Sequence, residues 1–122
     1  MDSVTLVYLV NSVLLIVHEI DSAYWREWEL FHLPGGLDFF LLLHVPLVSL
    51  ILYGLLEITT HSRLGKLLYF VVNFGGFFAF FIHSYFLRKG DERFTSTVSR
   101  ILLYSMLFVS LVQLYIGVSQ DF

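Results

Sequence analysis

The residues with the clearest chemical potential are three histidines that interrupt or border long apolar stretches: His18, His44 and His83. Two carboxylates, Glu19 and Asp21, follow the first histidine in the sequence HEID. Imidazole and carboxylate suit zinc, iron and manganese, and three protein ligands leave a further position open for water. We therefore predict a divalent metal held by the three histidines. Glu19 and Asp21 are the predicted catalytic groups, which orient a ligand or activate water.

The composition places these residues in a membrane. Of the 122 residues, 57% are hydrophobic and only 14% are charged, and the mean hydropathy is +0.79. Soluble domains carry about 25% charged residues, so the solvent that suits this chain is lipid. The net charge of −3 argues against a nucleic-acid partner. The lack of cysteine excludes disulfides and thiolate metal sites.

Four apolar segments organise the chain, and each approaches the ~20 residues that a helix needs to cross a bilayer. They cover approximately residues 4–24, 37–58, 65–87 and 94–118. Short polar connections, among them Pro34-Gly35-Gly36, make neighbouring segments antiparallel. The predicted fold is all-α, an integral membrane four-helix up-down bundle. Residues 1–122 are expected to form a single transmembrane domain.

The first helix is expected to extend past the bilayer. Its apolar part, residues 4–17, gives only about 21 Å of helix, so the HEID segment must complete the crossing. HEID then lies at one edge of the membrane. Continued to near Phe31, the helix would form an amphipathic cap on which Glu27, Glu29 and His32 contact water.

The three histidines are predicted to lie at similar depth. His44 stands about two turns into the second segment, and His83 stands a little over one turn before the end of the third. Tyr69, Gly76 and His83 recur every seven residues, so a small glycine shares the face of the histidine. Four further polar residues are expected to support the site: Asp38, Arg100, Ser22 and Asn11.

The distribution of basic residues predicts the orientation. Five of the seven lie in or near the loops on the HEID face: Arg26, Arg88, Lys89, Arg93 and Arg100. Positive residues favour the cytoplasmic side. The HEID face is therefore expected in the cytoplasm, with both termini outside.

Three short sequences carry a resemblance to a known family. They are HEID at 18–21, REW at 26–28 and HVPL at 44–47. With the layout of the four segments, they resemble a family of small, functionally uncharacterised bacterial membrane proteins with four spans. The resemblance implies a bacterial inner-membrane protein in which the His18 and His44 regions belong together. It implies no activity.

Three classes of function stay open, and whether the chain is an enzyme stays open with them. A metal at this depth could hydrolyse an amide or ester of a lipid-phase substrate, whereas an iron occupant would suggest oxidation. Two facing histidines could instead ligate a haem between helices. The third class is a non-catalytic accessory subunit or scaffold of a larger membrane complex. The expected partners are the lipid bilayer and a membrane protein or a second copy of the chain.

Overall fold

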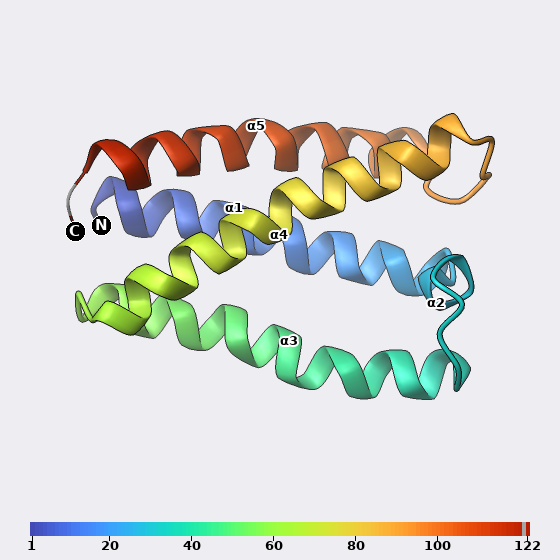
Figure 1. Ribbon diagram of the computed structural model, residues 1–122, viewed down its shortest axis with the longest axis horizontal. Helices are drawn as coiled ribbons and strands as arrows, with labels where there is room; N and C mark the ends of the chain where they lie inside the picture. Colours follow the sequence, from blue (N-terminus) through green and yellow to red (C-terminus); the bar gives the residue numbers. More distant parts are fainter. Residues whose placement is uncertain (121) are drawn as a thin grey trace.

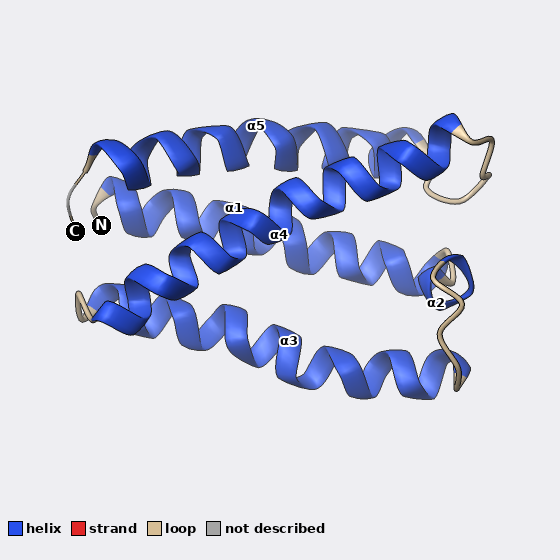
Figure 2. Ribbon diagram, viewed as in Figure 1, coloured by secondary structure: helices blue, strands red, loops and turns tan. Residues whose placement is uncertain are grey.

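The described residues of the computed structural model, 1–120 and 122, form five helices and no strand. The helices are α1 (Ser3–Tyr24), α2 (Glu27–Leu30), α3 (Gly36–Thr59), α4 (Arg63–Arg88) and α5 (Thr97–Ser119). The four long helices run up and down, joined by short loops (Figure 2). Both termini lie at one end of the bundle and α2 lies at the other, which we call the α2 end (Figure 1). The all-α bundle predicted from the sequence is confirmed.

The four long helices are each long and apolar enough to cross a membrane. Large apolar side chains cover their outward faces; Leu42, Phe74, Phe108 and Val118 are examples, each more than two-thirds exposed. A water-soluble protein of this size rarely exposes so much contiguous apolar surface. These features indicate an integral membrane protein in contact with lipid.

The helix α1 contacts all three other long helices, as α4 also does. Its buried face is unusually polar and carries Asn11, Ser12, His18 and Ser22 among its apolar residues. The helix α3 packs on α1 and α4. The helices α3 and α4 are close together at the turn that joins them, and they diverge towards the α2 end (Figure 1). A cavity lined by residues of α1, α3 and α4 includes His18 of the polar face in its wall.

A buried network of amides holds α1, α4 and α5 together midway along the bundle. Asn11 Nδ2 donates to Gln113 Oε1 at 2.7 Å and to Ser110 Oγ at 3.2 Å. Gln113 Nε2 donates to the Tyr69 carbonyl at 2.9 Å. Asn73 Nδ2 donates to the Ser110 carbonyl at 2.7 Å. In lipid, where water cannot satisfy these groups, such bonds fix the rotation of each helix about its axis.

The first helix does not continue unbroken to Phe31, as the sequence led us to expect. It ends at Tyr24. Arg26 then adopts a left-handed backbone conformation, with φ 56, and helical structure resumes as the short α2. This turn directs Glu27 back into the bundle, where it is 9% exposed. The expectation that Glu27 faces water was therefore wrong.

Candidate metal centre

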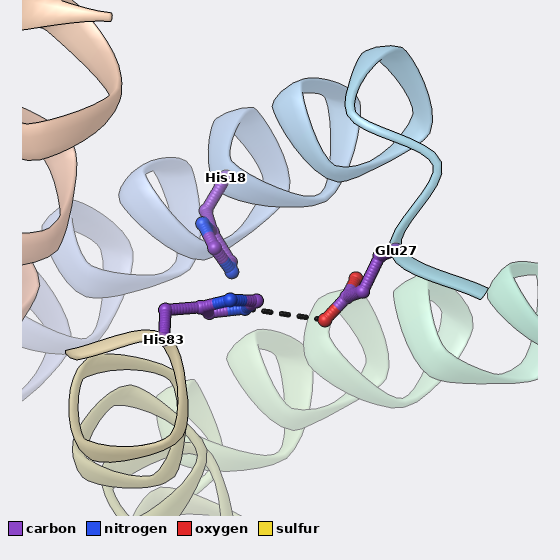
Figure 3. A group of neighbouring side chains, drawn as sticks. All are labelled: His18, Glu27 and His83. Carbon is purple, nitrogen blue, oxygen red and sulfur yellow. Dashed lines mark ion pairs between the residues drawn. The ribbon is translucent and has the colours of Figure 1, made fainter. Parts of the chain in front are cut away.

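Three side chains from three helices meet near the α2 end of the bundle. They are His18 of α1, Glu27 of α2 and His83 of α4, and they point towards one another (Figure 3). One ligand atom from each lies within 4.8 Å of the other two. Both histidines are 1% exposed. Two imidazole nitrogens and one carboxylate oxygen thus share a buried space.

Local structure explains how each side chain reaches this point. His18 lies seven residues after Asn11, on the polar inner face of α1. His83 follows Tyr69 and Gly76 at seven-residue steps on the buried face of α4. Glu27 owes its inward direction to the left-handed turn at Arg26. The site therefore depends on two helix faces and one turn.

The electrostatics of the group favour an anionic carboxylate beside two imidazoles. His83 Nε2 lies 3.2 Å from Glu27 Oε1. Burial acts to raise the pKa of the Glu27 carboxyl, but the hydrogen bond and charge of His83 outweigh it and hold that pKa below its usual range. The ring of His18 meets the ring of His83 edge to face, with centroids 4.7 Å apart. Within the described part of the chain, neither nitrogen of His18 has a hydrogen-bond partner, and His83 Nδ1 has none.

Aromatic rings close the group off at the α2 end. The ring of Phe94 lies 4.2 Å from that of His83 and 5.6 Å from that of His18, measured between centroids. Phe94 is 1% exposed and sits in the loop between α4 and α5 with φ 61. The ring of Phe31 also lies near His83, with centroids 6.3 Å apart. These rings separate the imidazoles from the aqueous phase.

A salt bridge holds the loop that carries Phe94 against the segment that carries Phe31. We call these two aromatic residues the cover of the group. Arg93, next to Phe94, contacts Glu29 of α2 at 2.9 Å and Asp91 at 2.9 Å. The Glu29 carboxylate raises the pKa of Arg93 above its ordinary value, so the guanidinium stays charged. The loop that carries Phe94 is thereby tied to the helix that carries Glu27.

The group fits a divalent ion in ligand type and number. Two nitrogens and one oxygen are ligands of zinc, iron and manganese, and they leave an open coordination position. Ligand atoms of a tetrahedral ion with bonds of ~2.1 Å lie about 3.4 Å apart. The three ligand atoms lie within 4.8 Å of one another, so no pair exceeds the tetrahedral separation by more than about 1.4 Å. One of the two unpartnered nitrogens of His18 is the atom that such an ion would bind.

His44, the third predicted ligand, lies next to this group and not in it. Its Nδ1 donates to the Phe40 carbonyl at 2.6 Å, and its Nε2 lies 2.5 Å from Glu19 Oε2. Glu19 follows His18 directly, so the three histidines do share one level of the bundle. The structure brings His18 and His83 together, and it places His44 on Glu19.

The other predicted residues divide between the surroundings of the site and other places. Ser22 lies one turn beyond His18 and donates to its carbonyl at 2.9 Å. Asp21 Oδ1 accepts from Trp25 Nε1 at 3.0 Å, so this carboxylate holds the indole and is not part of the His18 group. Asn11 belongs to the amide network, about 10.5 Å from His18 along α1.

Asp38 and Arg100 are both exposed. Asp38 stands in the first turn of α3. Arg100 lines a separate surface cavity with Arg88, Asp91 and Glu92 on the α4–α5 side of the bundle. Neither residue belongs to the group formed by His18, Glu27 and His83.

Sequence reasoning missed Glu27 as a member of the group and Phe94 as part of its cover. A carboxylate beyond the end of a membrane helix is normally solvated, and a left-handed turn at an arginine leaves no sequence signal. The REW stretch did contain Glu27 among the residues on which the family resemblance rested. Phe94 had no comparable signal.

A bundle of four membrane-length helices enclosing a buried imidazole–carboxylate group defines a small helical membrane protein with a candidate metal centre. The chain belongs to DUF6713, a family of unknown function, whose model matches residues 4–120. No curated protein and no solved structure matches the chain. The family assignment agrees with the expected uncharacterised family and adds no activity.

Proposed function

We propose that this protein is a membrane-embedded metalloprotein in which His18, Glu27 and His83 hold one divalent ion. The carrying observation is that three ligand atoms lie within 4.8 Å of one another while both nitrogens of His18 lack a partner among the described residues. A buried polar group without a partner costs about 1–3 kcal/mol. A bound ion removes that cost for the nitrogen that it binds. It also explains why the three side chains converge, which packing alone does not.

The ligand set restricts the ion and suggests its chemistry. Zinc, iron and manganese all accept two imidazoles and a carboxylate. Such an ion polarises a carbonyl and activates water. Glu19 lines the same cavity as the group and is held by His44, so it is placed to accept a proton from that water. We infer hydrolysis of an ester or amide in a lipid-phase substrate, with Glu19 as the base.

The cellular setting follows from the same reasoning. Residues 1–122 act as one transmembrane domain in a bacterial inner membrane. The excess of basic residues at the α2 end puts that end in the cytoplasm and both termini outside. The metal group then lies inside the cytoplasmic leaflet, near the depth of lipid carbonyls. His18 is six residues from the end of α1, about 9 Å along the helix axis.

The decisive experiment is elemental analysis of protein purified in detergent from metal-replete cells. We expect about one equivalent of zinc, iron or manganese in the wild type. His18→Ala, Glu27→Ala and His83→Ala should each lose it, while the matched control His61→Ala, an exposed histidine at the opposite end, should keep it. Treatment with a chelator should lower the thermal stability of the wild type towards that of the His83→Ala variant. A metal-free wild type would overturn the proposal.

One observation favours a second candidate, an accessory subunit or scaffold without a cofactor. The Glu19–His44 and Glu27–His83 pairs each satisfy a carboxylate with an imidazole, as a purely structural cluster would. In that case the wild type contains no metal and each pair contributes only to stability. A haem between His18 and His83 does not fit, because their rings are in direct contact and leave no room for a porphyrin.

A further inference from the structure

A cavity of about 240 Å³ adjoins the metal group and has two kinds of wall. One end is polar, with His18, Glu19, Glu27 and His83 at its surface. The remaining lining is apolar and comes from α1, α3 and α4. A ligand that suits both parts needs a hydrocarbon body and a polar end.

The cavity opens sideways, towards lipid. Its inner wall consists of buried residues, among them Leu15, Ile51, Val72 and Ala79. Its rim consists of exposed apolar residues on the two helices that separate: Leu47 and Leu50 on α3, and Val71 and Phe78 on α4. In a membrane this rim faces acyl chains, so the opening needs no aqueous path.

One residue in the wall keeps space open that a side chain would fill. A Cβ placed on Gly75 would meet no described atom within 4 Å, although Gly75 lines the cavity. Its neighbour Gly76 is different, because a Cβ there would lie 2.1 Å from Ser110 Oγ. Gly76 is thus needed for helix contact, whereas the lack of a side chain at Gly75 leaves room in the cavity.

A second cavity, of about 310 Å³, reaches the same carboxylates from beneath α2. It shares Glu19, Glu27 and Leu47 with the first and adds Trp28 and His44. Tryptophan is typical of the membrane–water interface. The carboxylates therefore stand between a lipid-facing cavity and one near the headgroups.

We propose that the lateral cavity binds one acyl chain of a bilayer phospholipid, which enters between α3 and α4 and brings its ester group to the carboxylates. At about 240 Å³ the cavity is below the ~300–1,000 Å³ usual for small-molecule sites, so it holds a segment of a single chain next to the ester and not a whole lipid. An ester is neutral, and it is compatible with the two carboxylates at the polar end. In the metal-free protein, a free fatty acid would add a third negative charge there.

This inference rests on the proposed function only for the chemistry at the polar end; the binding of the chain is a separate claim. It is tested with wild-type protein in phosphatidylcholine vesicles doped with a phosphatidylcholine that carries a diazirine in one acyl chain. After illumination, mass spectrometry locates the crosslinks. We expect them to concentrate on α3 and α4 around Leu50 and Gly75. Labelling spread evenly over all outward faces would overturn the proposal.

Two variants close the cavity from opposite sides. Gly75→Leu fills it from α4 and Leu50→Trp narrows its rim from α3; each should abolish the concentrated labelling. Gly75→Ala should retain most of it, and Val118→Phe, which adds bulk to an exposed position on α5, should leave it unchanged. If both closing variants fold and label as the wild type does, the cavity is not the binding site.

Two further measurements separate the sources of the chain and the two proposals. In protein stripped of metal by a chelator, a diazirine fatty acid at equal membrane concentration should label the cavity more weakly than the phospholipid; equal or stronger labelling would overturn the choice of an ester-linked chain. Gly75→Leu should keep its bound metal while losing the crosslink, and His83→Ala should do the reverse. A wild type that shows the concentrated crosslink but contains no metal would contradict only the proposed function, and one that contains metal but labels evenly would contradict only this inference.

Discussion

His83 Nε2 and Glu27 Oε1 lie 3.2 Å apart and join α4 to the turn that follows α1. These residues are 56 positions apart in the chain, and both are shielded from solvent. The pair therefore fixes the α2 segment against the bundle and sets the shape of the candidate metal centre.

The first prediction concerns this pair. In metal-free protein, Glu27→Ala should lower the free energy of unfolding by about 1–3 kcal/mol, because it leaves a buried imidazole without its partner. The control Glu29→Ala removes a half-exposed carboxylate and should cost less than about 1 kcal/mol. Denaturant unfolding in micelles measures both. A cycle with His83→Ala should give a coupling energy of about 0.5–3 kcal/mol, and additive effects would show that the two side chains do not interact.

The second prediction uses two adjacent glycines. Gly76→Ala brings a Cβ against Ser110 Oγ, which also accepts from Asn11, and should destabilise the bundle by about 1–3 kcal/mol. Gly75→Ala meets open space and should be neutral or stabilising by up to about 1 kcal/mol, since alanine is the better helix former. Adding Ser110→Gly to Gly76→Ala should recover part of the loss. Thermal unfolding of the four proteins is the measurement, and equal effects of the two alanines would contradict the packing described.

The third prediction concerns the bridge between Arg93 and Glu29. Arg93→Ala should change global stability by less than about 1 kcal/mol, because the bridge is partly exposed. It should, however, speed hydrogen exchange in α2 and in residues 91–96, because the salt bridge that joins these two segments is removed. Arg26→Ala removes a longer and more exposed contact with the same Glu29, 3.7 Å, and serves as the control.

The same bridge has a defined pH dependence on its cationic side. The pKa of Arg93 is raised in the folded state, so its contribution is fully present below the ordinary pKa of an arginine side chain and is lost only as pH rises through the still higher folded value. Exchange protection that depends on Arg93 should therefore be constant from neutral pH to about pH 10. A loss of protection in that range would show that another group controls the cover.

The fourth prediction concerns orientation. The chain contains no cysteine, so single cysteines report without background. Thr60→Cys, in the α3–α4 turn, should react with a membrane-impermeant maleimide on intact bacterial cells. Glu92→Cys, in the α4–α5 loop, should react only after permeabilisation. The reverse pattern would place the metal group in the outer leaflet.

The helical architecture could be read from the sequence because lipid imposes a simple rule. Each span must be about 20 apolar residues long and must satisfy its own backbone, so length and hydropathy locate it. The same rule gave the depth of His18 and His83, and the seven-residue repeat through Gly76 indicated the buried face of α4. The sequence therefore predicted that His18, His44 and His83 converge, and the structure brings only His18 and His83 together.

The rest of the site depended on rotations and turns that hydropathy does not encode. His44 has the expected depth, but the rotation of α3 directs its ring to Glu19. Glu27 reaches the group only because Arg26 adopts a left-handed backbone, a conformation that is uncommon for residues other than glycine. Asn11 shares the face of His18 on α1, yet its depth assigns it to the amide network. Spacing alone thus identified the level of the site and not its members.

The contact between Glu19 and His44 has a consequence for how the protein is made. These residues belong to α1 and α3, the first two long helices to leave the ribosome, so their carboxylate and imidazole can neutralise each other as soon as that hairpin enters the bilayer. His18 can contact His83 only after α4 has been inserted. Phe94 can cover both histidines only after the α4–α5 loop has formed. The order of synthesis therefore leaves the nitrogens of the candidate metal centre accessible until late in insertion, and the proposed ion would load from the membrane surface in that interval.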